Sequence, residues 1–184
     1  MNWEVIIKYM PKLLEGAWLT LELVAIAVVA GLILAIPLGI MRASTRWYVR
    51  AFPYAYIFFF RGTPLLVQLF IVYYGLPQFD FIREGALWPY LRSAFWCAVI
   101  TMTLHTAAYI AEIIRGAIQA IPSGEIEAAR ALGMSKWQTL FYITMPRAAR
   151  IGLPAYSNEV ILMLKASALA STITLLEFTG MART

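Results

Sequence analysis

The sequence predicts an all-α membrane protein that crosses the bilayer several times. Hydrophobic residues make up 61% of the 184 residues and charged residues 14%, with a mean hydropathy of +0.72. A soluble domain of this size could not cover so much apolar surface. Four separate runs are each about 20 apolar residues long, which is enough for a helix to cross the hydrocarbon core. No repeat or low-complexity tract divides the chain, so we expect a single domain over residues 1–184.

The four apolar runs define the expected membrane spans. We expect each run to be helical because a backbone in lipid must satisfy its own hydrogen bonds. The third run contains the single cysteine, Cys97, so an intrachain disulfide is impossible. The expected spans cover residues 17–41, 52–74, 95–114 and 154–176, and a polar loop covers residues 115–152.

The second run contains a helix-breaking sequence, FFFRGTPLLVQLF. Thr63 can supply a hydroxyl N-cap and Pro64 suits the first position of a helix. We therefore expect a break after Gly62 and a new helix from Pro64 toward Tyr74. The alternative is that Arg61 simply extends to the membrane surface from a regular helix.

Positive charges in the short loops predict the orientation in the membrane. Loops that follow the first and third runs are rich in arginine and lysine, and such loops stay in the cytoplasm. The N-terminus is then expected outside the cell. The charges concerned are Arg42, Arg46 and Arg50 in one loop, and Arg115, Arg130, Lys136, Arg147 and Arg150 in the other.

The polar loop predicts two short helices joined at Gly133. Glu125 lies in the first turn of the first helix, where the helix dipole favours an acid. Gly133 suits a left-handed C-cap, and Ser135 with Gln138 matches a capping box for the second helix. Pro146 is expected to end the second helix.

The two short helices should differ in what they contact. Trp137, Leu140, Phe141 and Thr144 recur at helical spacing, and this stripe is expected to pack on the ends of the protein's own spans. The first helix presents mainly alanine, which allows close approach by another molecule. A helical hairpin with no partner is the alternative.

The spacing within this loop resembles that of a known family. Glu127-Ala128-Ala129 is followed after three residues by Gly133, after nine more by Ile143, and after one more by Met145-Pro146. This pattern resembles the EAA loop of permease subunits in type I binding-protein-dependent ABC importers, with Met145 where leucine is usual. The resemblance implies that the loop docks into a separate ATPase subunit through Glu127, Ala128, Ala129, Gly133, Ile143 and Pro146.

Three longer segments resemble the polar amino-acid branch of that family, notably the histidine/arginine/lysine/ornithine and opine permeases. They are Phe60–Gly75, Tyr109–Gly133 and Pro154–Glu177. The resemblance implies an inner-membrane importer of polar, in particular basic, amino acids or opines. Its partners would be an ATP-binding subunit dimer, a sister permease subunit, and a substrate-binding protein. ATP would be bound by the partner, so no cofactor is expected in this chain. Family members usually have a fifth span, which this sequence lacks.

A polar stripe in the fourth run is the candidate substrate path. Asn158, Lys165 and Thr172 are seven residues apart, so they share one helix face. Lys165 could bind the carboxylate of an amino acid near the bilayer midplane. Glu159 lies on a different face and could serve a gate or bind a cationic side chain, and Ser167 could line the path or bond to the backbone. A structural ion pair of Lys165 is the alternative.

Other polar residues in the runs have simpler expected roles. Glu112 is expected to pair with Arg115 three residues later. His105, the single histidine, is expected to be a packing residue. An ion-coupled secondary transporter or channel is the alternative function. An intramembrane enzyme is disfavoured because no activated nucleophile can be assembled. No basic cluster with interleaved aromatics predicts nucleic-acid binding, and no metal-ligand set occurs.

Overall fold

The computed structural model describes residues 3–173, 175 and 181, and within these residues every regular element is a helix. The all-α prediction is therefore confirmed. In chain order the elements are α1 (Trp3–Arg42), α2 (Trp47–Gly62), α3 (Leu65–Phe70), the π-helical η1 (Ile71–Gly75), the 3₁₀ turn η2 (Leu76–Gln78), α4 (Asp80–Arg83), α5 (Trp88–Leu91), α6 (Ala94–Gln119), α7 (Ser123–Ala131), α8 (Lys136–Gln138), the π-helical η3 (Thr139–Thr144), α9 (Met145–Ala166) and the 3₁₀ segment η4 (Ser167–Ile173).

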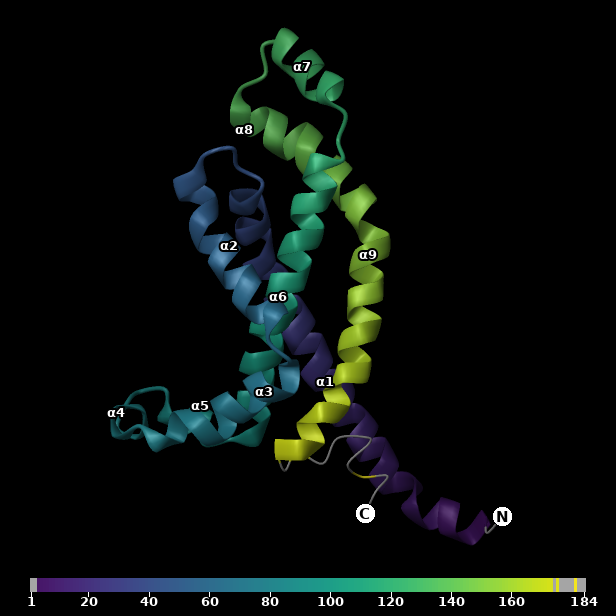
Figure 1. The fold of residues 1–184 in the computed structure, drawn as a ribbon. Coiled ribbons are helices and arrows are strands. Elements are labelled where there is room, and N and C mark those ends of the chain that lie inside the picture. The colour runs from purple at the N-terminus through teal and green to yellow at the C-terminus, as the bar shows by residue number, and fades with distance from the viewer. Residues whose placement is uncertain (1–2, 174, 176–180, 182–184) are drawn as a thin grey trace.

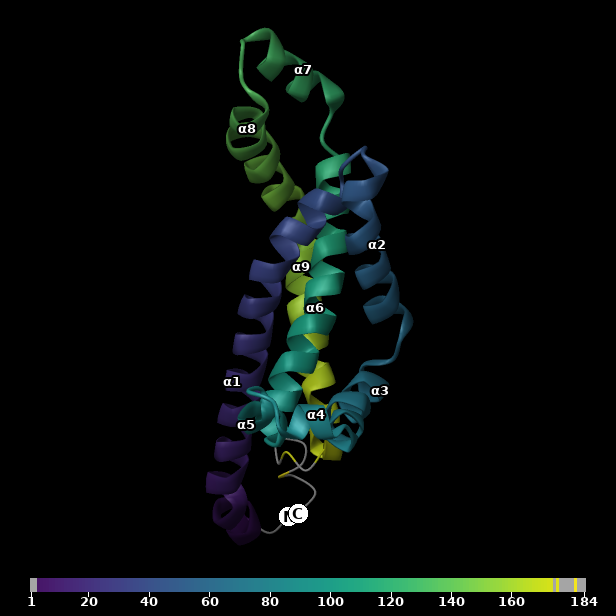
Figure 2. The same cartoon turned by 90° about the vertical axis from the view of Figure 1, so that its left-hand side faces the viewer.

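The molecule is an elongated bundle arranged around α6. Helix α6 packs against α1, α2 and α9, and the two perpendicular views show these helices running along the long dimension of the molecule (Figures 1 and 2). Helices α7 and α8 lie at one end. Helices α4 and α5 lie at the opposite end, so the polar loop and the connection between α3 and α6 are on different sides of the bundle (Figure 1).

Two of the described helices are long and apolar enough to cross a membrane. They are α1, over Tyr9–Arg42, and α6. A third span results if α2 and the segment Leu65–Gln78, which meet at an angle of 100°, count as one broken span. At about 1.5 Å per residue, the 40 residues of α1 give a helix about twice as long as the hydrocarbon core is thick, so α1 must tilt or project beyond it.

Helix α9 corresponds to the fourth expected span but begins earlier. It starts at Met145 rather than Pro154, because Pro154 lies within the helix and does not interrupt it. Four charged residues, Arg147, Arg150, Glu159 and Lys165, lower its apolar character, and it is not among the helices that qualify by composition. A transmembrane α9 therefore stays a prediction. The end of this expected span, at residue 176, lies outside the described residues.

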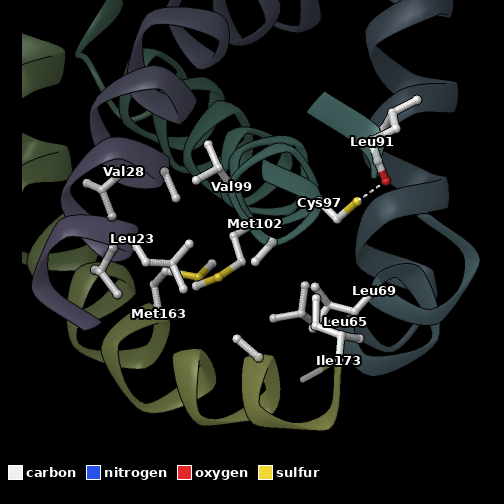
Figure 3. Packing of buried hydrophobic residues seen from close by; sticks show 14 residues of the cluster. Leu23, Val28, Leu65, Leu69, Leu91, Cys97, Val99, Met102, Met163 and Ile173 are labelled. Atoms are coloured by element: carbon white, nitrogen blue, oxygen red, sulfur yellow. Dashed lines mark hydrogen bonds between the residues drawn. The ribbon is translucent and has the colours of Figure 1, made fainter. Parts of the chain in front are cut away.

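The main core lies where α1, α3, α6 and α9 meet. Leu23 of α1, Leu69 of α3 and Met102 of α6 are fully buried, and Met163 of α9 reaches the same cluster (Figure 3). Cys97 is buried beside them, and its thiol donates to the Leu91 carbonyl at 3.1 Å. Burying such side chains stabilises a fold by about 1.5–3 kcal/mol each relative to exposure in water. The gain is smaller for a side chain that would otherwise contact lipid, because lipid tails are also apolar.

The contact between α1 and α6 depends on two glycines. A Cβ at Gly31 would lie 2.6 Å from Thr106 Cγ2, and one at Gly39 would lie 2.8 Å from Ile114 Cβ and 2.9 Å from the Ala111 carbonyl oxygen. Small residues let membrane helices approach closely enough for extensive van der Waals contact. These glycines therefore set the distance between the two longest helices.

The break in the second expected span is confirmed, with a different cap. Helix α2 ends at Gly62 and α3 begins at Leu65. The prediction that Thr63 is the N-cap is wrong, because Pro64 is the cap residue and the Thr63 hydroxyl donates back to the Phe59 carbonyl at 2.8 Å. The carbonyls at the end of α2 lack partners within the helix, and the Thr63 hydroxyl donates to one of them instead of capping α3.

Candidate coupling loop and transport path

Helices α7 and α8 form the capped pair that the sequence predicts. Gly133 has φ +79°, in the left-handed region that favours glycine, and its amide donates to the Arg130 carbonyl at 2.9 Å. The Ser135 amide donates to Gln138 Oε1 at 2.8 Å and the Gln138 amide donates to Ser135 Oγ at 3.3 Å, so the capping box is confirmed. The turn between the helices is therefore fixed by local backbone chemistry.

Pro146 does not end the second helix, so that prediction is wrong. The helix continues from α8 through the π-helical η3 into α9. The Met145 amide donates to the Leu140 carbonyl five residues earlier, and this wider turn leaves room for the proline ring. As a result, one unbroken helical segment connects the loop to the charged residues of α9.

The expected packing of the aromatic stripe is also wrong. Trp137 is 70% exposed and Phe141 is 60% exposed, and their rings stack on each other with centroids 6.0 Å apart. Of the four residues, only Thr144 is buried, and Leu140 is half-buried. Leu132, at the end of α7, is 84% exposed. Helical spacing identified an apolar face correctly but could not identify what covers it. The isolated chain leaves this end of the molecule uncovered.

The motif residues of the loop are placed on different surfaces. Glu127, Ala128, Gly133 and Pro146 are exposed, Ile143 is half-buried, and Ala129 is buried. A Cβ added at Gly133 would meet no atom within 4 Å. The outward face of α7 is therefore built from Glu127 and Ala128, while Ala129 is turned into the protein.

An ion pair that the sequence did not predict connects α7 to α9. Arg147 donates from Nε to Glu125 Oε2 at 2.9 Å and from its terminal nitrogen to Glu125 Oε1 at 2.6 Å. The hydrogen bonds and charge of Glu125 raise the pKa of Arg147 above its usual value. The two residues are 22 positions apart, and no helical spacing rule relates them. This bidentate ion pair constrains the angle of α7 relative to the continuous helical segment formed by α8, η3 and α9.

Glu159 is the buried charge of the predicted substrate path. It is 7% exposed on α9 and lies close to Thr106 of α6, within electrostatic range of Arg61 of α2. The Arg61 guanidinium lies over the Tyr109 ring, 5.1 Å from its centroid. Three helices therefore bring charged or polar groups together at one level of the bundle.

Lys165 and its predicted companions lie on a separate, outward surface. Asn158, Lys165 and Thr172 are all exposed, whereas Ser167 is buried and its hydroxyl donates to the Leu164 carbonyl at 2.7 Å. The Thr172 hydroxyl likewise donates to the Leu169 carbonyl at 2.6 Å. Within the described residues Lys165 forms no ion pair with Glu159 or any other acid. The stripe thus faces outward in this single chain.

Gln68 is a functional candidate that the sequence reasoning missed. It is buried, and its Nε2 donates to the Phe60 carbonyl at 2.9 Å and to the Thr63 hydroxyl at 2.7 Å, across the break between α2 and α3. Its Oε1 lies 3.2 Å from His105 Nδ1, which assigns the Nδ1–H tautomer to His105. The sequence did contain a signal for this role, namely a glutamine in an apolar run four residues after Gly62-Thr63-Pro64. His105 is thus a hydrogen-bonded packing residue.

The expected pair of Glu112 and Arg115 is confirmed. Arg115 Nη2 lies 2.5 Å from Glu112 Oε1, and Arg115 Nε donates to the same oxygen at 2.7 Å. Gln119 accepts a further hydrogen bond from the same guanidinium. Glu112 therefore has a local structural partner near the end of α6.

Comparison with known proteins identifies relatives over nearly the whole chain. The chain is 51% identical to the octopine transport system permease protein OccM of Rhizobium meliloti over 98% of this chain and 72% of that protein. It is 45% identical to the nopaline permease protein NocM of Agrobacterium fabrum, covering all of this chain and 76% of that one. It is 42% identical to the histidine/lysine/arginine/ornithine permease protein HisM of Salmonella typhimurium, covering 98% and 80%.

Solved structures and a family model agree with these relatives. A chain of an amino acid ABC transporter crystallised with histidines is 37% identical and superposes with a TM-score of 0.85, covering all of this chain and 81% of that one. A chain of the MetNI methionine ABC transporter shares the fold with a TM-score of 0.72 at 24% identity, covering 89% and 75%. The family model matches residues 19–182. The chain belongs to the family of inner membrane components of binding-protein-dependent transport systems.

Proposed function

We propose that this permease subunit imports basic amino acids or opines and is driven by a separate ATP-binding subunit dimer docked at α7. The relatives named above transport octopine, nopaline or histidine, lysine, arginine and ornithine. The observation that carries the proposal concerns the end of the molecule formed by α7 and α8, called the tip below. There the EAA-type motif lies beside the exposed side chains of Leu132, Trp137 and Phe141. A soluble substrate-binding protein and a sister permease subunit complete the assembly. ATP is held by the partner, and this chain binds no cofactor itself.

Docking at the tip is tested at Gly133. A valine there would need a left-handed backbone that costs about 1–2 kcal/mol for an L-residue, and a β-branched residue more, although its side chain would meet nothing. We expect G133V to weaken ATPase association and uptake together. G133N, which tolerates the same backbone, should retain both. G116V is the matched control, since Gly116 lies in α6, is exposed, lacks a positive φ and also has open space around it. Unchanged ATPase association in G133V would refute docking at this turn.

The substrate path is proposed to use Glu159 for a cationic side chain and Lys165 for a carboxylate. The buried position of Glu159 supports this role, because burying an acid that forms no ion pair within the described residues costs free energy, and acids inside membrane segments commonly mark functional sites. Asn158 and Thr172 would line the part of the path at Lys165, on an outward surface apart from the buried Glu159. Ser167 is the further candidate, and its buried hydroxyl donates to the Leu164 carbonyl.

We expect K165M and E159Q each to abolish uptake while assembly and basal ATPase activity survive. The measurement is uptake of labelled arginine or octopine into vesicles that contain the assembled transporter. Normal uptake by an assembled K165M transporter would exclude the carboxylate role. E159Q that imports neutral but not cationic substrates would assign Glu159 to side-chain selection.

An ion-coupled transporter or channel would differ from the proposed importer in its energy source. Uptake by the proposed assembly requires ATP and the substrate-binding protein. A thermal-shift screen of the cognate binding protein against amino acids and opines would identify the substrate. Uptake that persists without ATP and collapses with the proton or sodium gradient would favour the alternative.

A further inference from the structure

A basic cavity outside the proposed path lies between the end of α1 and the start of α2. It has a volume of about 440 Å³ and is lined by Arg42, Trp47, Arg50, Ala51 and Tyr54. Two of these five residues are cationic and two are aromatic, and none is acidic. A second cavity, on the other side of Arg42 and Tyr54, continues toward Phe58 and Arg61.

Arg42 is held in position without a counter-ion. Its guanidinium lies over the Tyr54 ring, 5.0 Å from the centroid, and its buried Nε has no hydrogen-bond partner among the residues that the structure describes. The acid that lines the neighbouring cavity is Glu112, whose Oε1 is paired with Arg115. Glu112 forms no ion pair with Arg42, and its buried Oε2 has no hydrogen-bond partner within the described residues. Among the described residues no acid pairs with Arg50 either. Two unneutralised guanidinium groups therefore face one cavity, a favourable arrangement for an anion.

The surroundings of the cavity are those of a membrane interface. Trp47 and Tyr54 are exposed at its rim, as aromatic residues commonly are at the level of lipid headgroups. Along α2, Tyr54 stacks on Phe58, which is 70% exposed, and Phe59 is also exposed. Of the sixteen residues of α2 only Pro53 and Ile57 are buried, so the helix offers a mostly apolar outer face next to the arginines.

We propose that this cavity binds the phosphate of an anionic phospholipid, with the acyl chains lying along the outer face of α2. A guanidinium presents paired donors that match phosphate oxygens, and basic pockets at the ends of membrane helices bind anionic headgroups. Membership of an inner-membrane family places the chain in a lipid bilayer, independently of the substrate or orientation proposed above. The occupant is a lipid rather than a soluble anion because the cavity opens beside the exposed rings of α2.

The test is lipid retention by the purified full chain in detergent, measured by native mass spectrometry. We compare phosphatidylglycerol with phosphatidylcholine, which differ in net charge at the headgroup. The variant R42Q/R50Q should retain phosphatidylglycerol about 25-fold less, since each cation near an anionic surface contributes about five-fold. R42K/R50K keeps the charges and should retain most of the binding. R130Q/R150Q removes two exposed arginines outside the cavity and should bind as the wild type does.

A second measurement does not depend on the arginine variants. Phosphatidylglycerol with brominated acyl chains should quench Trp47 fluorescence, obtained as the difference between wild type and W47F, more strongly than brominated phosphatidylcholine. Inorganic phosphate should displace little of the lipid, because it gains nothing from the outer face of α2.

Several results would overturn the proposal. Equal retention of the two lipids, or equal losses in R42Q/R50Q and R130Q/R150Q, would exclude a specific headgroup site. Full displacement by inorganic phosphate would assign the cavity to a soluble anion. Retention of phosphatidylglycerol by R42Q/R50Q equal to that of the wild type would exclude the two arginines from lipid binding.

Discussion

At the scale of single residues, Gly39 controls how closely α1 and α6 approach. An alanine there would place its Cβ 2.8 Å from Ile114 and 2.9 Å from the Ala111 carbonyl oxygen. The Ala111 carbonyl is part of the helix backbone, so relieving this clash requires α1 and α6 to separate. We expect G39A to destabilise the chain by about 1–3 kcal/mol, measured by thermal unfolding in detergent. G116A in α6 is the control, because its Cβ would meet no atom within 4 Å. Equal stability of G39A and G116A would show that α1 and α6 can separate without cost.

Gln68 is the second residue on which local structure depends. Replacing it with leucine leaves the carbonyls of Phe60 and Thr63 without the Nε2 donor, so we expect Q68L to lose about 1–3 kcal/mol of stability. Within the described residues Gln78 donates only to the Tyr74 carbonyl, at 3.2 Å in an exposed position. Q78L should therefore change stability by less than about 0.5 kcal/mol. Denaturant titration of both variants separates the two cases. If Q68L loses no more stability than Q78L, water must satisfy the carbonyls of Phe60 and Thr63 at the break between α2 and α3.

At the scale of elements, the Glu125–Arg147 pair joins the loop to the long helix. The pair is partly exposed, so solvent screening leaves it only a small contribution to stability. Its expected effect is on coupling. E125R and R147E should each lower the uptake per ATP hydrolysed, and the double variant E125R/R147E should recover it.

The control for this pair is R150Q, which removes a neighbouring exposed arginine that forms no ion pair within the described residues. R150Q should leave the ratio of uptake to hydrolysis unchanged. If the double variant is as uncoupled as the single ones, the pair does not act as a connection.

The sequence predicted those elements whose cause is local. The Gly62–Pro64 break, the left-handed Gly133 and the Ser135–Gln138 capping box each follow from a few adjacent residues, and all three are present. Thr63, Pro146 and the Trp137 stripe were misjudged because their outcome depends on competition. The Thr63 hydroxyl could accept from the amides of the next helix or donate to a carbonyl of the preceding one, and it donates. Pro146 fell beside a widened turn, and no described residue covers Trp137 and Phe141. Glu125 and Arg147 could not be paired without the fold.

At the scale of the whole molecule, the opposite placement of α7 and α4 predicts which groups are on each side of the membrane. Leu132 and Glu84 are both exposed, and the single native cysteine, Cys97, is buried. Of the variants L132C and E84C, we expect only E84C to react with an impermeant maleimide in intact spheroplasts. L132C should react after permeabilisation, and the wild type should stay unlabelled. The reverse pattern would invert the orientation that the loop arginines predict.

The π-helical turn η3 has a consequence for the spacing of the motif. A π-helical turn holds one residue more than an α-helical turn, and each residue of an α-helix advances the chain by about 100° around its axis. Deleting one residue from Thr139–Thr144 would therefore leave a regular α-helical turn and keep α9 at nearly the same angle to the capping box at Ser135. A deletion in the α-helical part, by contrast, would turn everything that follows by about 100°. The nine residues between Gly133 and Ile143 pass through the wide turn. The wide turn thus lets this spacing contain one more residue without changing the angular phase between the loop and Glu159.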